Sequence, residues 1–187
     1  MRTATPLEQP RAVGSARVSS KVAANGSTID ALRQSGALKL LFPRNPDRVE
    51  SIVVNTAGGI TGGDDFRIEA KAGDRSHLTL TTQAAERIYR AQPGQTGSLS
   101  TRLSVGADAT LHWVPQETIL YDNAALNRSL RVDLAKTATF LMVEPVLFGR
   151  QAMGETLTSA HFADQIDVRR DGMPLYRDGA ILTGKKM

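Results

Sequence analysis

The sequence predicts a mainly β protein, built as a stack of antiparallel hairpins in a sandwich or flattened barrel, with one or two short helices. Three observations predict this class. Apolar and polar residues alternate with a period of two in many short segments, which is typical of half-buried strands. These segments recur at a spacing of roughly ten residues, and small polar turns separate them.

The alternating or apolar segments are predicted as strands, in chain order, at residues 12–24, 38–42, 49–54, 66–70, 77–82, 99–105, 110–114, 126–134, 138–143, 160–168 and 175–182. Turns at 72–74, 106–108 and 135–137 join neighbouring strands, so we expect each of these pairs to form a hairpin. A final hairpin is expected around the turn at 171–174. Helical character is expected in a single turn at 29–34 and in the stretches 83–90 and 149–155.

The chain of 187 residues is predicted as one domain at residues 12–187, preceded by a disordered tail at residues 1–11. The tail has no apolar block, so it predicts neither a signal peptide nor a transit peptide. The longest apolar runs are far shorter than the ~20 residues of a membrane span. Cysteine is absent, which excludes disulfides and thiolate metal sites and fits a cytoplasmic protein.

The net charge is +4, and aromatic residues make up only 5% of the chain. Basic residues form no long run, and a stacking platform for nucleic acid has little aromatic material. Arginine far outnumbers lysine, and its planar fork suits carboxylates and protein interfaces. We therefore interpret the charge as solvated surface together with interface arginines.

The most constrained stretch is 55–66, where four of the sixteen glycines fall within six positions. They are Gly58, Gly59, Gly62 and Gly63. Their spacing fits a P-loop, but Asp64 and Asp65 stand where Lys and Ser or Thr are required, and negative charge there repels a phosphate. Ile60 likewise breaks the dinucleotide-binding fingerprint. The local interpretation is a tight connection between two strands, because glycine supplies the backbone conformations that such a loop needs.

Candidate chemistry rests on carboxylates. His77, His112 and His161 lie far apart in the sequence, none at a ligand spacing, and each is interpreted as a strand residue. No Gly-x-Ser-x-Gly motif is present, so hydrolytic catalysis has no candidate. Seven carboxylates lie beside turns or strand ends: Asp64, Asp65, Glu86, Glu117, Asp122, Glu144 and Glu155. Oxygen ligands hold divalent ions exchangeably, which suits passage of an ion. Surface ion pairs with the arginines are the alternative.

Four blocks of the sequence carry a resemblance to a known family. They are residues 55–64, 81–90, 113–119 and 148–155, which begin with Asn-Thr-Ala-Gly-Gly, Thr-Thr-Gln-Ala-Ala, Trp-Val-Pro-Gln-Glu and Phe-Gly-Arg-Gln-Ala. Together and in this order, they resemble the urease accessory protein UreD, called UreH in some species. The resemblance covers most of the chain from about Leu38 onward.

This resemblance implies a mostly β, elongated, β-helix-like fold and a non-enzymatic assembly factor. Such a protein is a scaffold and chaperone for GTP-dependent nickel insertion into apo-urease. It binds apo-urease and, through the accessory protein UreF, the GTPase UreG, so that nickel reaches the urease site as its lysine is carbamylated. No tightly bound cofactor is expected, and Ni2+ passes transiently through a polar, water-filled passage.

The resemblance also implies roles for individual residues. Asp64, which closes the glycine block, is expected to contact nickel transiently, with Glu86 and Glu117 behind it. The four glycines are expected to shape the loop. Tyr89 and the block at 148–155 are expected to face a partner, and the residues singled out in that block are Arg150, Met153 and Glu155.

Two other functional classes stay open. One is an enzyme that binds a small anion through the arginines, against which Asp64 and Asp65 weigh. The other is a nucleic-acid-binding β protein, against which the few aromatics weigh. We expect no nucleic-acid or membrane partner. Family members continue well past the position of Leu182, so the domain is expected to be shorter at its C-terminus than the family.

Overall fold

The computed structural model describes residues 10–150 and 153–185. The strands are β1(Val13–Ala23), β2(Gly26–Gly36), β3(Leu38–Leu41), β4(Val49–Asn55), β5(Asp65–Ala72), β6(His77–Thr82), β7(Glu86–Ile88), β8(Gly97–Val105), β9(Thr110–Trp113), β10(Thr118–Leu120), β11(Ala124–Leu134), β12(Thr139–Met142), β13(Val146–Phe148), β14(Ser159–Arg170) and β15(Met173–Lys185). Within the described residues the chain is mainly β, as the sequence predicts, and no α-helix is assigned.

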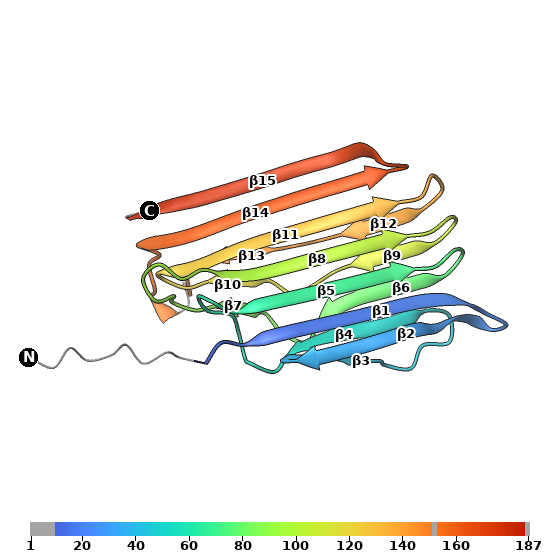
Figure 1. The fold of residues 1–187 in the computed structure, drawn as a ribbon, viewed down its shortest axis with the longest axis horizontal. Coiled ribbons are helices and arrows are strands. Elements are labelled where there is room, and N and C mark those ends of the chain that lie inside the picture. The colour runs from blue at the N-terminus through green and yellow to red at the C-terminus, as the bar shows by residue number, and fades with distance from the viewer. Residues whose placement is uncertain (1–9, 151–152, 186–187) are drawn as a thin grey trace, which may run out of the picture.

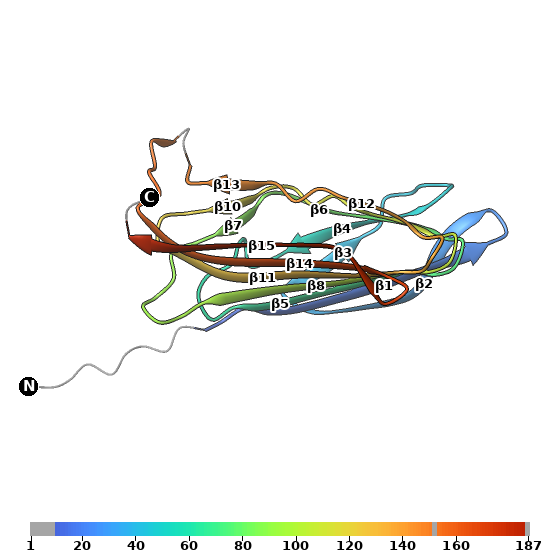
Figure 2. The same ribbon diagram turned by 90° about the horizontal axis from the view of Figure 1, so that it is seen from above.

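The strands form a β-helix-like coil with three sheets. A seven-stranded sheet has the order β15-β14-β11-β8-β5-β1-β2, and we call it the long sheet. The other two sheets have the orders β12-β9-β6-β4-β3 and β13-β10-β7. Successive coils place one strand in each sheet, for example β5, β6 and β7, and then β8, β9 and β10. Figure 1 shows these coils stacked side by side, and the view from above in Figure 2 shows the flattened cross-section.

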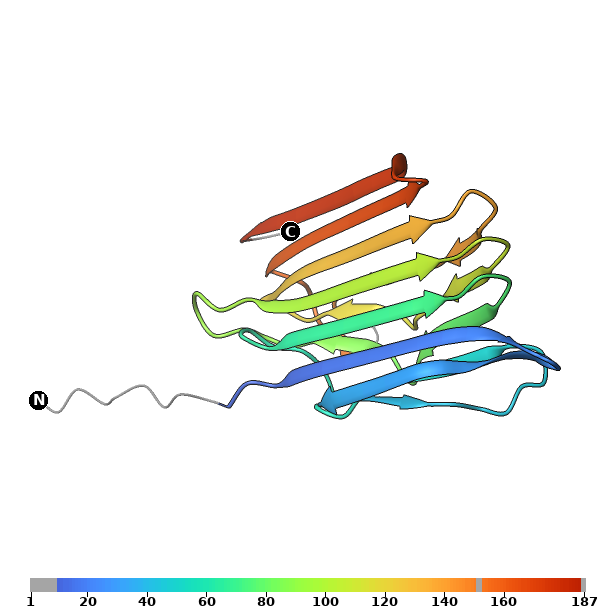
Figure 3. The same cartoon turned by 45° about the vertical axis from the view of Figure 1, so that its right-hand side comes forward.

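Most neighbouring strands run parallel, which corrects the predicted stack of antiparallel hairpins. β5 pairs in parallel with β1 and β8, whereas β6 pairs in parallel with β4 and β9. The turns predicted at 72–74, 106–108 and 135–137 therefore carry the chain across to the opposite sheet, as Figure 3 shows at the right-hand ends of the strands. Alternation identifies a half-buried strand but does not identify its neighbour, so the sequence could not separate the two arrangements.

Antiparallel pairing does occur at both ends of the long sheet. The predicted final hairpin is confirmed, because β14 pairs antiparallel with β15. β1 also pairs antiparallel with β2, so the helical turn predicted at 29–34 is wrong. The predicted helix at 83–90 is wrong too, since it contains strand β7. The stretch 149–155 lies partly outside the described residues, as does most of the predicted tail at 1–11.

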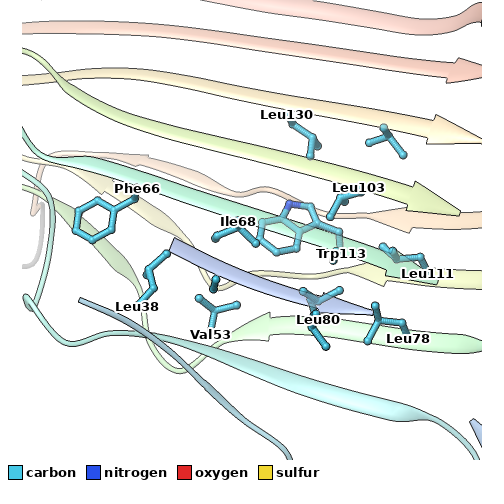
Figure 4. Close-up of a cluster of buried hydrophobic side chains, with 14 of the residues drawn as sticks. Leu38, Val53, Phe66, Ile68, Leu78, Leu80, Leu103, Leu111, Trp113 and Leu130 are labelled. Atoms are coloured by element: carbon cyan, nitrogen blue, oxygen red, sulfur yellow. The ribbon is translucent and has the colours of Figure 1, made fainter. Parts of the chain in front are cut away.

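Apolar side chains fill the space between the sheets in ladders that run along the coil axis. The parallel register places Leu78 beside Leu111 and Leu80 beside Trp113, and all four are at most 3% exposed. Figure 4 shows these side chains facing Ile68 and Leu103 across the interior. Each fully buried leucine stabilises the fold by roughly 1.5–3 kcal/mol. This core therefore fixes the register of the coils and positions the polar groups described next.

Candidate functional site: an interior chamber and an aromatic edge

The glycine loop closes one turn of the coil. It leaves β4, passes the three-stranded sheet where Ile60 bridges Ile88, and enters β5 in the long sheet. Gly59 has a φ of 153°, and an added Cβ would lie 2.3 Å from Tyr89 Cε2 and 2.6 Å from the Arg87 carbonyl oxygen. Only glycine fits such a position, because both the backbone conformation and the space exclude a side chain. The loop connects two strands, as predicted, but the strands lie in different sheets.

Asp64 holds this loop in place. Its Oδ1 accepts a hydrogen bond of 2.8 Å from the Ala12 amide, and its Oδ2 accepts one of 2.8 Å from the Thr61 amide. The residue is only 6% exposed. Both carboxylate oxygens therefore tie the loop to itself and to the start of β1. The nickel contact expected for Asp64 stays a prediction.

A cavity of about 190 Å³ lies inside the coil and touches strands of all three sheets. We call it the chamber. Its polar lining comes from Asn55, Gln83, Glu86, Gln116, Arg128 and Glu144, and its apolar wall includes Phe66, Leu99 and Trp113. Asn55, Glu86 and Arg128 come from strands, whereas Gln83, Gln116 and Glu144 come from loops. Gln83 and Gln116 are exposed, so the chamber extends from the apolar core to the surface between these loops.

Glu86 lines the chamber from β7. Its Oε1 accepts a hydrogen bond of 3.0 Å from Asn55 Nδ2, which also donates to the Gly59 carbonyl at 3.0 Å. Burial raises the pKa of Glu86 from its ordinary value of 4.5 to about 7, although the hydrogen bond from Asn55 opposes the rise. The carboxyl group therefore exchanges its proton near neutral pH and is linked through Asn55 to the glycine loop.

Arg128 enters the interior from β11. It donates to both carboxylate oxygens of Asp164, at 2.9 Å from Nε and 2.5 Å from Nη2. Glu144 Oε2 lies 3.8 Å from the same guanidinium and has no hydrogen-bond partner among the described residues. Trp113 Nε1 holds the other oxygen of Glu144 at 2.7 Å. Burial lowers the pKa of Arg128, but the hydrogen bonds that it donates to Asp164 and the charge of Glu144 outweigh this effect and raise the pKa.

Two carboxylates, Asp164 and Glu144, lie near the single positive charge of Arg128. Glu86 is a further acidic group in the chamber lining, and this group ionises near neutral pH. Glu144 is one of the seven carboxylates that the sequence indicates, although no metal contact is predicted for it. Arg128 and Asp164 were missed, although a signal exists. In β11 the inward residues are Ala124, Leu126, Arg128, Leu130 and Val132, so the parity of the alternation points this arginine into the core.

Glu117 lies apart from these groups. Its carbonyl accepts a hydrogen bond of 2.9 Å from the Glu86 amide, but its side chain is not part of the chamber lining. The structure thus brings Glu86, and not Asp64 or Glu117, to the chamber. Within residues 10–150 and 153–185, no group of three or more His, Asp or Glu side chains could hold a metal ion. The passage role of all three acids stays a prediction.

The partner-facing residues predicted from the sequence gather at one edge, beside the three-stranded sheet. The Tyr89 ring packs on Gly59, and its hydroxyl donates to the Gly58 carbonyl at 3.1 Å. Tyr89 and Tyr121 meet edge to face at 5.1 Å between ring centroids. The Arg150 guanidinium lies 4.3 Å from the Tyr121 ring centroid. Four successive coils thus contribute one member each to a continuous row that is joined by three contacts.

Glu155 fixes the end of this row, because it accepts hydrogen bonds of 3.0 Å from both the Arg150 amide and Nε. The hydrogen bond from the Arg150 side chain lowers the pKa of Glu155. Met153 is 76% exposed beside it. The alternative interpretation of the carboxylates as surface ion pairs therefore holds for Glu155, and also for Asp65, which pairs with Arg67 at 2.7 Å.

All three histidines lie in strands, as predicted, but two of them meet. His77 in β6 and His112 in β9 stack edge to face at 4.9 Å between ring centroids. Burial, and the charge of the neighbouring His112, lower the pKa of His77. The sequence does not predict this contact, because the two histidines are far apart in the chain and only the parallel pairing of β6 with β9 brings them together.

These features define a β-helix-like protein with a carboxylate-lined interior chamber and an aromatic, arginine-rich edge. A family model described as "UreD urease accessory protein" matches residues 12–187. The chain belongs to this family. In the described residues, no helix is long and apolar enough to cross a membrane.

Similar proteins named urease accessory protein UreD occur in several bacteria. The chain is 62% identical to that of Roseobacter denitrificans over 98% of this chain and 67% of the relative. It is 59% identical to that of a Ruegeria species over 96% of this chain and 61% of the relative. It is 42% identical to that of Agrobacterium fabrum over 96% of this chain and 63% of the relative. The chain thus spans roughly three fifths to two thirds of the length of these relatives.

Proposed function

We propose that the protein is a non-enzymatic scaffold and chaperone for nickel insertion into apo-urease. Membership of the UreD family supports a role in urease maturation. In this proposal the protein binds apo-urease and UreF in the cytoplasm and, through UreF, the GTPase UreG. GTP hydrolysis then drives the release of nickel, which this chain passes on without holding it as a cofactor.

The chamber is the observation that carries the proposal. A cavity of about 190 Å³ holds one ion with a few waters, and Glu86 and Glu144 supply oxygen ligands to it. Oxygen ligands exchange Ni2+ readily, and two carboxylates bind it less tightly than a complete ligand set would. Such a lining suits an ion in transit, for which Ni2+ is cargo.

The state of Glu86 supports the same role. Because its pKa is about 7, a divalent ion that enters the chamber displaces a proton, and a proton that returns helps to release the ion. Asn55 connects this carboxyl group to the glycine loop. Asp64 contributes in this proposal by fixing the loop, and it contacts nickel only where an amide hydrogen bond opens.

Two measurements test the proposal. The first compares urease activity and nickel content in cells that express urease with UreF and UreG, with and without this chain. The second uses Ala85→Trp, since Ala85 lines the chamber and the indole would fill it. Ala107→Trp, in an exposed turn, is the matched control.

We expect Ala85→Trp to lower urease nickel at least fivefold while the protein still binds its partners, and the control to leave nickel unchanged. Equal nickel content in both variants would refute the role of the chamber. Urease that activates equally well without the chain would refute the maturation role as a whole.

A further inference from the structure

The edge beside the three-stranded sheet carries a surface whose composition differs from the rest of the molecule. We call it the Tyr-Arg strip and define it by Tyr89, Arg90, Tyr121 and Arg150, which line one depression, together with Arg87, which neighbours Tyr89 and also borders the chamber. Tyrosine and arginine are the residues most often found at the energetic centres of protein interfaces. The strip includes a surface depression of about 420 Å³ between Tyr89, Arg90, Tyr121 and Arg150.

The strip has positive charge that the fold itself does not use. Both acids within it are already committed, because Glu155 binds the backbone and guanidinium of Arg150, and Asp122 accepts hydrogen bonds from the Thr158 and Ser159 amides. Arg90 reaches Asp122 only at 3.9 Å and is 72% exposed. No carboxylate of the described residues lies within ion-pair distance of Arg87.

The aromatic rings of the strip are fixed in advance. Tyr89 packs against Gly59 and hydrogen-bonds the glycine loop, and Tyr121 is held between Tyr89 and Arg150. A partner therefore meets a rigid surface and loses little side-chain entropy when it binds. Exposed apolar side chains continue this surface along β13 and beyond, with Leu147 at 48%, Phe148 at 50% and Met153 at 76% exposure.

We infer that the Tyr-Arg strip docks an acidic segment of a partner protein, whose carboxylates pair with Arg87 and Arg90 while its apolar side chains cover Leu147 and Phe148. Charge complementarity selects this occupant, since exposed guanidinium groups suit carboxylates, and among the described residues Arg87 has no ion-pair partner and Arg90 has only the long contact with Asp122. The inference rests on the proposed function, because it assigns a surface to one of the partners proposed there.

The geometry favours a protein over a nucleic acid. Bases stack on free aromatic faces, but the Tyr89 ring packs against Gly59 and the Arg150 guanidinium lies over the Tyr121 ring. The apolar flank formed by Leu147, Phe148 and Met153 also matches a protein side-chain surface better than a phosphate backbone.

Zero-length cross-linking tests this inference. Arg87→Lys and Arg90→Lys keep the charge and supply an amine that carbodiimide couples to a carboxylate in contact with it. Each variant is coexpressed with apo-urease and UreF, and the purified complex is cross-linked and mapped by mass spectrometry. Arg102→Lys, on the exposed face of β8 in the long sheet, is the matched control.

We expect cross-links from positions 87 and 90 to Asp or Glu of one partner, and none from position 102. We also expect Arg87→Glu with Arg90→Glu to weaken that complex at least tenfold at low salt, whereas Arg102→Glu leaves it unchanged. A complex that forms without cross-links from 87 and 90 would overturn the inference and leave the proposed function standing. If no complex forms at all, both the inference and the proposed function are overturned. If the strip captures nucleic acid that nuclease removes, and no protein, the inference alone is overturned.

Discussion

Glu86 gives the sharpest prediction, because its substitution by glutamine should stabilise the protein at alkaline pH. Folding raises the pKa of this carboxyl group from 4.5 to about 7. The folded state therefore binds the proton more tightly than the unfolded state, and stability is lost as pH rises from about 4.5 to 7. Each pH unit in that window is worth about 1.4 kcal/mol, so the full cost above pH 7 is about 3 kcal/mol.

Glu86→Gln removes this cost, since an amide has no charge to bury and its oxygen can still accept the hydrogen bond from Asn55. Urea unfolding at pH 5, 6, 7 and 8 measures the effect. We expect the variant and the parent protein to have similar unfolding free energies at pH 5. At pH 8 we expect the variant to be more stable by up to about 3 kcal/mol.

Glu155→Gln is the matched control. Its hydrogen bond to Arg150 lowers its pKa, so the carboxylate is charged throughout this range, and its loss should change the unfolding free energy by the same amount at every pH. A difference for Glu86→Gln that does not vary with pH, or a variant that is less stable at pH 8, would refute the assignment of a buried, near-neutral carboxyl group.

Three further predictions concern unfolding free energies measured by the same titration at pH 7. Asp164→Asn breaks the buried ion pair with Arg128 and should lower the unfolding free energy by about 3–5 kcal/mol. Asp133→Asn breaks the exposed pair with Arg131 and should lower it by less than about 1 kcal/mol, so equal losses would contradict the buried network. Gly59→Ala should lower the unfolding free energy by about 2–4 kcal/mol, because it adds backbone strain and a steric clash. Gly58→Ala should lower it by about 1–2 kcal/mol, because an added Cβ there meets open space. The reverse order would be inconsistent with the loop geometry. Asp64→Asn should cost about 1–2 kcal/mol because one of two amide hydrogen bonds loses its acceptor, and an unchanged stability would show that this carboxylate does not hold the loop.

The sequence predicts the β class and most strand positions, because alternation reports directly which residues face the core. It could not predict that β5 and β6 belong to opposite sheets. A local pattern is the same whether a turn reverses the chain within a sheet or carries it across to another. The helix predicted at 83–90 is wrong for a related reason. β7 has only three residues, which is too short to show the two-residue alternation of a strand.

The site was partly predictable. The resemblance singles out Glu86 and the residues of the edge, and the structure places Tyr89, Arg150 and Glu155 close together, whereas their roles stay predictions. The glycine block singles out Asp64 for nickel contact, but one of the two amides that donate to its carboxylate belongs to Ala12 beside β1, which is distant in sequence. Arg128 and Asp164 pair because the parallel register sets β11 beside β14, and no local signal reports that register.

Nickel in purified urease, measured by mass spectrometry of the metal, tests the central claim most directly. Urease is isolated from cells that express it with UreF, UreG and this chain carrying Glu86→Gln or, as the control, Glu69→Gln, which alters an exposed ion pair with Arg17 on the long sheet. If the chamber passes nickel, Glu86→Gln lowers the nickel content at least fivefold although the complex is recovered in normal yield. Full nickel content with Glu86→Gln would contradict a carboxylate-lined passage through this protein.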